Sequence, residues 1–517
     1  MNSCVHKEVS VKSAAARFVL VAFLLPLLLP VTAFGQWSRT NLQAAANGTG
    51  WVTSNVTFAH TANAVSINAV SPIILRGNVT SNFATSVGNL TDSLLSLGNA
   101  QKTGAAATLS GLIRTQVDGF GIPAGLVDIQ GDGSSRGVVT NNIVGFNNTR
   151  WIEIQSGKRL GLENLHFNAV TMENTFTYTG GTGAGGMTNG LIGNISSNAN
   201  DIAMGDVIGN AFSDIAVILH GYRDTQYLAG GGIIGLRATG ELAVSASAEI
   251  GRITGNVFRE VSILTDQSAD GGANGSAYIE GGGIIGVDAV SSPADIPGHA
   301  RIDELSNNLF TDIKVRSDDI ILGGGLVGVN NNSQRYDADT YSRIGRVSGN
   351  IFGNGVLDTA TLSNSDIYVY SRYSLRGGGV IGVNGLFNAA VELDELTGNV
   401  FAGIAVESDS YLKGGGIVGL QSDDGGPKCS GDPCAPGTPN TAVETFLSQA
   451  SDNLFLNAYV KVNTYLDGGG IIGLRSNTGM SALYELGGNI FKGLTVAVRD
   501  ASDSNYLHGG GIVGVSS

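Results

Sequence analysis

Short runs of alternating apolar and polar residues recur through the second half of this chain. Ile313–Ser317 and Val460–Asn463 both place branched aliphatic residues at every second position, with polar residues between them. A period of two is typical of a strand with one buried face. No stretch of this region sustains the period of a helix, so the pattern predicts a protein built almost entirely of short β-strands.

Two short phrases recur along this strand-rich region. One phrase has three glycines, two branched aliphatic residues, a fourth glycine and a Leu or Val; the other is Asn-x-Phe. The glycine phrase begins at Gly230, Gly281, Gly323, Gly377, Gly414, Gly468 and Gly509, and Asn-x-Phe begins at Asn210, Asn256, Asn308, Asn350, Asn399, Asn453 and Asn489. A repeat of 37–54 residues indicates stacked units that bury their apolar faces against one another.

We therefore predict an all-β fold, a right-handed parallel β-helix with about two coils in each repeat. Coils would lie about 4.8 Å apart, so equivalent residues would form ladders. The Phe of Asn-x-Phe would stack inside, and the Asn would hold a corner, since Asn tolerates the left-handed conformation and bonds to nearby backbone. The glycines would form a bend or a close approach, and loops at the corners would absorb length differences.

The residue before each glycine triplet varies between apolar, acidic and basic, which predicts a position that faces outward. By alternation, tyrosines two residues earlier also face outward, unless a bulge near the glycines reverses the direction. Aromatic side chains contribute much of the contact energy in recognition, so this column is the possible binding face. The alternative is that the rings stack on one another or turn into the core. The column contains Tyr227, Tyr278, Tyr411, Tyr465 and Tyr506.

The N-terminus predicts export. Basic residues precede the apolar run Phe18–Val31, and the small residues Ala33 and Gly35 fit a cleavage site. The run is shorter than the span of about 20 residues that crosses a membrane. We expect residues 1–35 to be a signal peptide, residues 36–150 to form an N-terminal cap with the first coils, and residues 151–517 to form the repeat β-helix.

The net charge and the cysteine content limit which ligands and partners the protein can bind. The formal net charge of −14 argues against nucleic acid, whose binding needs a surplus of basic residues. A Pro-rich and Cys-containing loop is expected to be inserted near residues 422–441. Its Cys429 and Cys434 would form a disulfide in an oxidising compartment, or else remain a reduced pair. A metal site is disfavoured because no nearby His or Cys supplies two further ligands.

Two motifs match patterns known from cofactor-binding or catalytic sites, but the residues around them disfavour both functions. The glycine phrase matches G-x-G-x-x-G, but it recurs seven times and is followed by strand-forming residues instead of a helix. Gly133–Gly137 matches G-x-S-x-G within a cluster of turn residues. The acidic pairs Asp318-Asp319 and Asp423-Asp424 do not recur in register, so they indicate solvated surface charge. We predict no cofactor, no metal and no enzymatic activity.

Beyond these patterns, Ile152–Phe167, which alternates as strand, glycine turn and strand, resembles the strand pair near the start of bacterial autotransporter passengers. The paired glycine and Phe/Asn phrases are similar to the repeats of polymorphic outer membrane proteins, although there the Asn follows the Phe. The resemblance covers about residues 150–517. It implies export, display at a Gram-negative cell surface or outer membrane, and adhesion. Such passengers continue into a C-terminal translocator barrel, which we expect to be missing here or supplied by another chain.

We thus expect a secreted or surface-displayed adhesin or structural stalk. Its partners would be a host surface, a glycan or other copies of itself, with membrane attachment only through the missing barrel. One alternative is an extracellular polysaccharide lyase or hydrolase on the same fold, which would need convergent acids on one face. Another is a self-associating surface protein, which homotypic aggregation of displaying cells would favour.

Overall fold

The computed structural model describes most of the chain from residue 202 onward. Side chains are described for residues 192–193, 202–219, 227–240, 246–266, 277–290, 298–332, 340–386, 390–423, 445–477, 480–499 and 506–516. Strands that lie earlier are described by their backbone alone, apart from residues 192–193.

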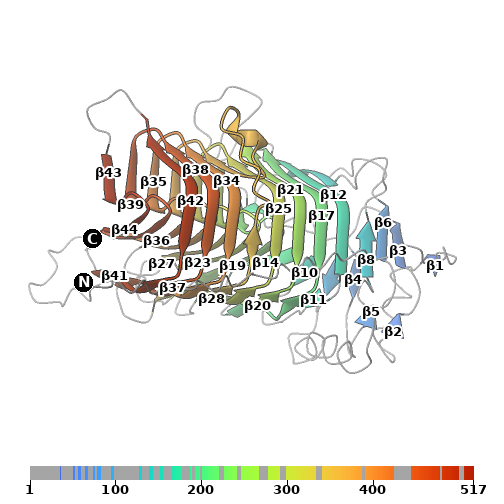
Figure 1. The fold of residues 1–517 in the computed structure, drawn as a ribbon. Helices are drawn as coiled ribbons and strands as arrows, with labels where there is room; N and C mark the ends of the chain where they lie inside the picture. The colour runs from blue at the N-terminus through green and yellow to red at the C-terminus, as the bar shows by residue number, and fades with distance from the viewer. Residues whose placement is uncertain are drawn as a thin grey trace, which may run out of the picture. The chain divides into compact units, whose positions relative to one another are not determined.

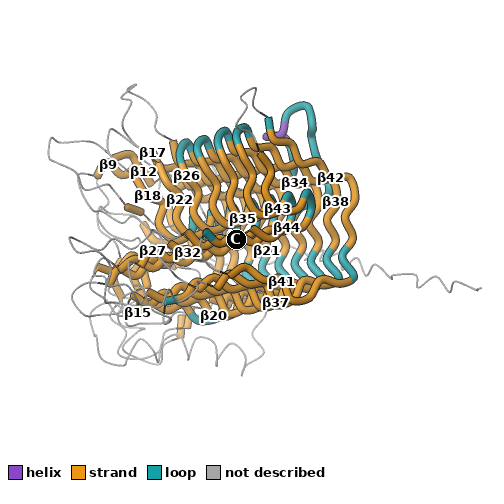
Figure 2. Tube along the Cα trace, turned by 90° about the vertical axis from the view of Figure 1, so that its left-hand side faces the viewer, coloured by secondary structure: helices purple, strands orange, loops and turns teal. Residues whose placement is uncertain are grey.

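Parallel strands stack into four long sheets, and each coil contributes one strand, in places interrupted, to each sheet (Figures 1 and 2). We name the sheets by their most distinctive residues. The phenylalanine sheet contains β12 (Leu165–Phe176), β17 (Ala211–His220), β21 (Val257–Asp266), β25 (Leu309–Ser317), β29 (Ile351–Phe352), β30 (Ile367–Ser371), β34 (Val400–Ser408), β38 (Leu454–Val462) and β42 (Ile490–Val498). The tyrosine sheet contains β13 (Met187–Thr188), β18 (Gln226–Gly230), β22 (Ala277–Gly282), β26 (Ile320–Gly324), β31 (Ser374–Gly378), β35 (Tyr411–Gly415), β39 (Tyr465–Gly469) and β43 (Tyr506–Gly510).

The other two sheets complete each coil. The glycine sheet contains β14 (Ile192–Ser197), β19 (Ile234–Gly240), β23 (Ile285–Ser291), β27 (Val327–Ser333), β32 (Ile381–Leu386), β36 (Val418–Asp423), β40 (Ile472–Ser476) and β44 (Val513–Ser516). The arginine sheet contains β15 (Asp201–Met204), β16 (Val207–Ile208), β20 (Ala246–Thr254), β24 (Gly298–Ser306), β28 (Tyr341–Ser348), β33 (Ala390–Thr397), β37 (Glu444–Ser451) and β41 (Met480–Gly487). Earlier strands are β1 (Gly35–Gln36), β2 (Trp51–Val52), β3 (Val56–Ala59), β4 (Val65–Ile67), β5 (Ile74–Leu75), β6 (Val79–Asn82), β7 (Leu95–Leu97), β8 (Val127–Gln130), β9 (Val139–Ile143), β10 (Ile152–Ile154) and β11 (Leu162–Glu163).

The fold is the predicted parallel β-helix, but the expected two coils per repeat are wrong. Phe212 of β17 is the register partner of Phe258 in the adjacent parallel strand β21, so one repeat forms one coil. The discrepancy arises because four strands, many of them eight to ten residues long, use up the whole repeat.

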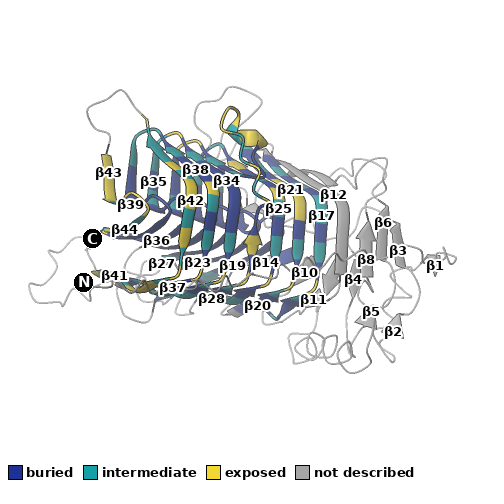
Figure 3. Cartoon of the chain, viewed as in Figure 1, coloured by how far each residue is buried: buried dark blue, intermediate teal, exposed yellow. Residues whose placement is uncertain are grey.

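The phenylalanine ladder was predicted correctly. The rings of Phe212, Phe258, Phe310, Phe352, Phe401 and Phe455 are fully buried. Figure 3 shows buried residues along strands of the phenylalanine sheet such as β17 and β34. Consecutive rings from Phe212 to Phe491 stack with centroids 4.7–5.0 Å apart and interplanar angles of 3–10°. This spacing matches the separation of neighbouring strands, so each ring packs on the equivalent ring of the next coil.

The asparagines hold a corner as predicted, but by a different mechanism. Asn308 donates its backbone N–H and its Nδ2 to Oδ1 of Asn350, at 3.0 and 2.9 Å, and Nδ2 also donates to the Ile253 carbonyl at 2.8 Å. The left-handed residue is the one before the asparagine, such as Asn307 with φ 54°. The bonds therefore join successive coils instead of capping a local turn.

Each glycine of the triplet meets a separate constraint, and Gly323–Gly325 illustrates all three. Gly323 has φ +96°, a conformation that L side chains rarely adopt. A Cβ on Gly324 would lie 1.9 Å from the Val327 carbonyl oxygen, and one on Gly325 would lie 2.0 Å from that of Gly379. The triplet is thus both a bend and a close approach of backbones, as predicted. We call this bend between the tyrosine and glycine sheets the glycine corner.

One insertion does not lie at a corner. Residues 353–366, with a short 3₁₀ helix η1 (Leu362–Asn364), separate β29 from β30 within the phenylalanine sheet. The Asp366 carboxylate accepts the backbone N–H groups of Asn354 at 2.6 Å and Asp312 at 2.9 Å. Extra length can therefore interrupt a strand, provided that side chains fasten both ends of the insertion.

Candidate binding faces

The glycine corner turns the outer faces of two sheets toward each other. Beyond the backbone contact, a column from the tyrosine sheet meets a column from the glycine sheet. Arg475 shows the contact directly, because its Nε donates to Oδ2 of Asp467 at 2.6 Å. The pre-glycine column contains Ala229, Glu280, Leu322, Arg376, Lys413, Asp467 and His508. The facing column contains Arg237, Asp288, Asn330, Asn384, Gln421, Arg475 and Ser516.

The pre-glycine column points away from the core as predicted, yet solvent barely reaches much of it. Glu280 is 5% exposed and Asp467 is 8% exposed, because the facing column covers them. Asp288 and Gln421 in the facing column are completely buried. The side chain at the pre-glycine position therefore varies because the side chain that it meets across the glycine corner varies. The variation does not mean that the position is exposed to solvent.

The five candidate tyrosines lie on the outer side of the tyrosine sheet and stack in two groups. Tyr227 and Tyr278 have centroids 5.3 Å apart; Tyr411 and Tyr465 lie 5.0 Å apart, and Tyr465 and Tyr506 lie 4.9 Å apart. The rings therefore face outward, as predicted, and they also stack on one another, as the alternative predicted. Binding by this column stays a prediction. Because the ring faces cover each other, ring edges and hydroxyls are what this column offers to a ligand.

Next to the second tyrosine group lies a cluster of charged side chains, which we call the Asp423 cluster. Asp423 accepts Arg475 Nη1 at 2.6 Å, and it lies 3.3 Å from Arg376 Nη1 and 3.4 Å from Lys413 Nζ. Asp467 pairs with Arg475 at 2.6 Å. These five side chains are only 10–22% exposed. The expectation that Asp423 is a solvated surface charge is therefore wrong, because the glycine corner folds three cations around it.

The electrostatics of the cluster follow from this crowding. Burial opposes ionisation of Asp423, but Lys413, Arg475 and Arg376 together hold its pKa below the usual value. Burial, with the neighbouring charges of Arg475 and Arg376, lowers the pKa of Lys413 despite Asp423. Burial alone would raise the pKa of Tyr411, yet Arg376, which donates to Tyr411 Oη at 3.0 Å, helps to lower it. The neighbouring cations thus contribute to all three shifts in pKa, together with burial at Lys413 and a hydrogen bond with Ser374 at Tyr411.

A second buried cluster lies at the glycine corner several coils earlier, and we call it the Arg237 triad. Arg237 forms ion pairs with Glu280 and, at 2.9 Å, with Asp288. Asn330 Nδ2 donates to Asp288 Oδ1 at 2.7 Å. Burial and the nearby Glu280 carboxylate raise the pKa of Asp288 to about 7, although Arg237 opposes this shift. One guanidinium thus faces two carboxylates.

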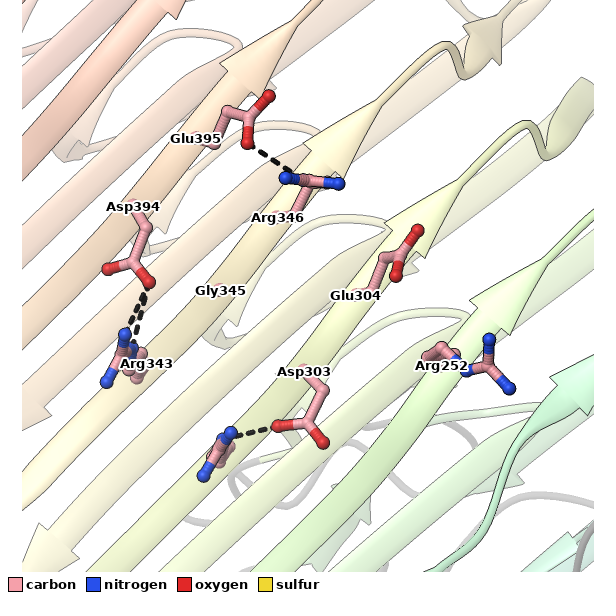
Figure 4. A pocket seen from close by; sticks show the side chains of 9 residues that line it. Arg252, Asp303, Glu304, Arg343, Gly345, Arg346, Asp394 and Glu395 are labelled. Atoms are coloured by element: carbon pink, nitrogen blue, oxygen red, sulfur yellow. Dashed lines mark hydrogen bonds and ion pairs between the residues drawn. The ribbon is translucent and has the colours of Figure 1, made fainter.

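The outer face of the arginine sheet carries an open hollow of about 470 Å³ that the sequence reasoning missed (Figure 4). A column of alternating charge crosses it, consisting of Arg252, Glu304, Arg346 and Glu395. Arg346 Nε lies 2.8 Å from Glu395 Oε2. All four residues lie four positions before the Asn of Asn-x-Phe, so aligning the repeats would have revealed the column. Four arginines balance four carboxylates in the lining, so the hollow is electrically neutral.

Several predicted features lie outside the described residues. The signal peptide and the Cys429–Cys434 loop are among them, so both stay predictions. Of the acidic pair Asp318-Asp319, Asp318 pairs with Arg316 at 3.0 Å while Asp319 is only 4% exposed, so only Asp318 behaves as a surface charge, as predicted. Within the described part of the chain, no helix is long and apolar enough to cross a membrane. The same residues contain no group of three or more His, Cys, Asp or Glu side chains placed to hold a metal ion.

Comparison with known proteins adds no family: no protein-family model, curated protein or solved structure matches the chain. The class of the protein, a parallel β-helix with one coil per repeat, therefore rests on its own strands and ladders.

Proposed function

We propose that the chain is an exported, surface-displayed protein, resembling an autotransporter passenger, that acts as a non-enzymatic adhesin or structural stalk. One observation carries the proposal most directly. The asparagine bonds run unbroken from Asn210 to Asn489 and keep all the repeats in one register. A solenoid held in this way provides a stiff scaffold with long outer faces, which suits binding at an extended surface.

The tyrosine sheet supports adhesion more than the other faces do. It presents Tyr411, Tyr465 and Tyr506 beside a cationic cluster, and tyrosine and arginine are the residues that most often dominate binding energy at interfaces. The hydroxyls and ring edges can exchange hydrogen bonds with a glycan or a protein. The arginine-sheet hollow fits the role less well, because its charges already neutralise one another.

Cells that display the protein test the proposal. We expect them to bind a host surface or glycan, or one another, and we expect Tyr411→Phe, Tyr465→Phe and Tyr506→Phe together to weaken that binding. Phenylalanine keeps the stacking and removes only the hydroxyls, so the fold is retained. The matched control is Tyr368→Phe with Tyr370→Phe, on the outer side of the phenylalanine sheet, which should leave adhesion unchanged.

Other results would replace the proposal. Release of oligosaccharides from a panel of polysaccharides would favour a lyase or hydrolase on the same fold. Aggregation of displaying cells without binding to any host surface or glycan would favour a self-associating structural protein. Full adhesion by the triple phenylalanine variant would remove the tyrosine column from the binding face.

A further inference from the structure

The glycine corner buries two charge clusters with opposite imbalances. The Arg237 triad contains one cation and two carboxylates, whereas the Asp423 cluster contains three cations and two carboxylates. Charges removed from water must be neutralised by partners, by protons or by counter-ions. A surplus carboxylate can take up a proton, but a surplus arginine cannot lose one at ordinary pH. The Asp423 cluster therefore needs either a neutral Lys413 or an added anion.

Hydrogen bonding in the Asp423 cluster leaves donors unused. The contacts of Asp423 with Arg376 and Lys413 are long, at 3.3 and 3.4 Å, whereas its contact with Arg475 is 2.6 Å. Arg376 Nε is buried and has no hydrogen-bond partner, although Nη2 donates to Tyr411. Three side chains thus compete for one carboxylate, and the two weaker contacts remain available to a second acceptor.

A buried amide supplies the second, independent observation. Gln421 is 0% exposed, and neither Nε2 nor Oε1 has a hydrogen-bond partner. It lies eight residues after Lys413, the same offset at which Arg475 contacts Asp467 across the corner. The amide therefore faces the Lys413 side of the corner and adds a free N–H donor to the cationic surplus.

We propose that the Asp423 cluster binds a carboxylate anion, as carried by the acidic sugars of a glycan. Arg376 and Lys413 would donate to the carboxylate, with the buried amide of Gln421 behind them, and the hydroxyls of Tyr411 and Tyr465 would face the rest of the ligand. Charge-assisted bonds to a carboxylate are about twice as strong as neutral ones. The cluster side chains remain 10–22% exposed, so an anion can reach them from solvent. The anion site stands without the proposed function; its assignment to a glycan rests on that function and gives the adhesin a ligand class.

Calorimetric titration of the exported chain at pH 7 and constant ionic strength tests the proposal. The probes are sodium glucuronate, sodium acetate and glucose. We expect a Kd on the order of 1 mM for glucuronate, which corresponds to a few charge-assisted bonds, and no binding of glucose. Equal affinity for acetate would assign the site to free carboxylates; tighter binding of glucuronate would assign it to acidic sugars. Absence of heat with both carboxylates would overturn the proposal.

Two variants with opposite expected effects separate binding from folding. Lys413→Gln should weaken glucuronate binding at least tenfold, while Lys461→Gln, at a lysine paired with Glu407 on the phenylalanine sheet, should not change it. Asp423→Asn should tighten binding, because it enlarges the cationic surplus. If both cluster variants weaken binding alike, or neither changes it, the site is wrongly assigned. Intact adhesion in a Lys413→Gln variant that no longer binds glucuronate would remove the glycan assignment and leave the adhesin proposal standing.

Discussion

Replacing Asp288 by asparagine is expected to stabilise the protein at and above neutral pH. Asp288 is completely buried and shares Arg237 with Glu280, so one of the two carboxylates is left without a cation of its own. An asparagine at this position removes that charge. Its Oδ1 can still accept from Asn330 Nδ2, as the carboxylate does at 2.7 Å. Its Nδ2 replaces the Oδ2 that lies 2.9 Å from Arg237 Nη1, so it loses that contact but can donate to Glu280.

The magnitude follows from the shift in pKa between the folded and unfolded chain. The pKa of Asp288 rises from 3.8 to about 7 on folding, so the folded protein binds this proton more tightly. A raised carboxyl pKa means that stability is highest below the unfolded value and is lost as pH rises toward about 7. At about 1.4 kcal/mol for each pH unit, the ionised group costs up to about 4 kcal/mol, of which we expect the variant to recover about 1–4 kcal/mol.

Thermal melts of the wild type and the Asp288→Asn variant at pH 5 and pH 8 provide the measurement. Because the two proteins are compared at the same pH, the contribution of the other titrating groups to the stability is the same in both and cancels in the difference. The variant should gain clearly more stability at pH 8 than at pH 5, because at pH 5 the unfolded carboxyl is already ionised while the folded one still keeps its proton. Asp318→Asn, which removes a surface partner of Arg316, serves as the control and should show little effect at either pH. Equal destabilisation of Asp288→Asn at both values would refute the reasoning.

Three further substitutions test the ladders and the corner, each by urea or thermal unfolding. Phe310→Ala should cost about 3–5 kcal/mol, because the ring is fully buried between two others; a loss below 1 kcal/mol would contradict an internal ladder. Asn308→Ala should cost about 2–4 kcal/mol, since it removes the side-chain partners of the buried Asn256 N–H and Ile253 carbonyl on the preceding coil; Asn308→Gln should not rescue it. Arg475→Ala should cost about 3 kcal/mol by uncovering two buried carboxylates, whereas Arg346→Ala, with a side chain 55% exposed, should cost less than about 1 kcal/mol; similar losses would mean that the corner is solvated.

The interior of this fold could be predicted from the sequence because each ladder repeats one residue type. Phe310 and its equivalents recur with the same neighbours, and an aromatic residue that recurs in every unit of a stacked solenoid is expected to pack in the interior. The close approach at Gly324 was predictable for the same reason. The number of coils per repeat was not, since it depends on strand length, and the alternating pattern does not reveal where a strand such as β21 ends.

The charged clusters were missed for a different reason. Sequence reasoning treated the position before each triplet as independent, so Lys413 and Asp467 looked like interchangeable surface residues. Their partners lie across the glycine corner, eight residues later in the same coil or on a neighbouring coil, as Arg475 does for Asp467. Only the sharpness of the bend, which depends on backbone contact at Gly469 and Gly473, makes these columns meet.

At the glycine corner, backbone contacts of the glycines hold the two sheets together, while the side chains of the facing columns vary from coil to coil. Glycine backbones at the bend keep the two sheets in contact whatever side chains follow, because the first, second and fourth glycines of each phrase meet only backbone atoms. The facing columns can therefore change from an acid-rich triad at Arg237 to a cation-rich cluster at Asp423 without altering the register. Each change must be matched across the corner, since an unmatched buried charge is costly. A parallel β-helix of this kind can thus place binding chemistry on one or two coils, and the surplus of cations at Asp423 is where such chemistry is expected.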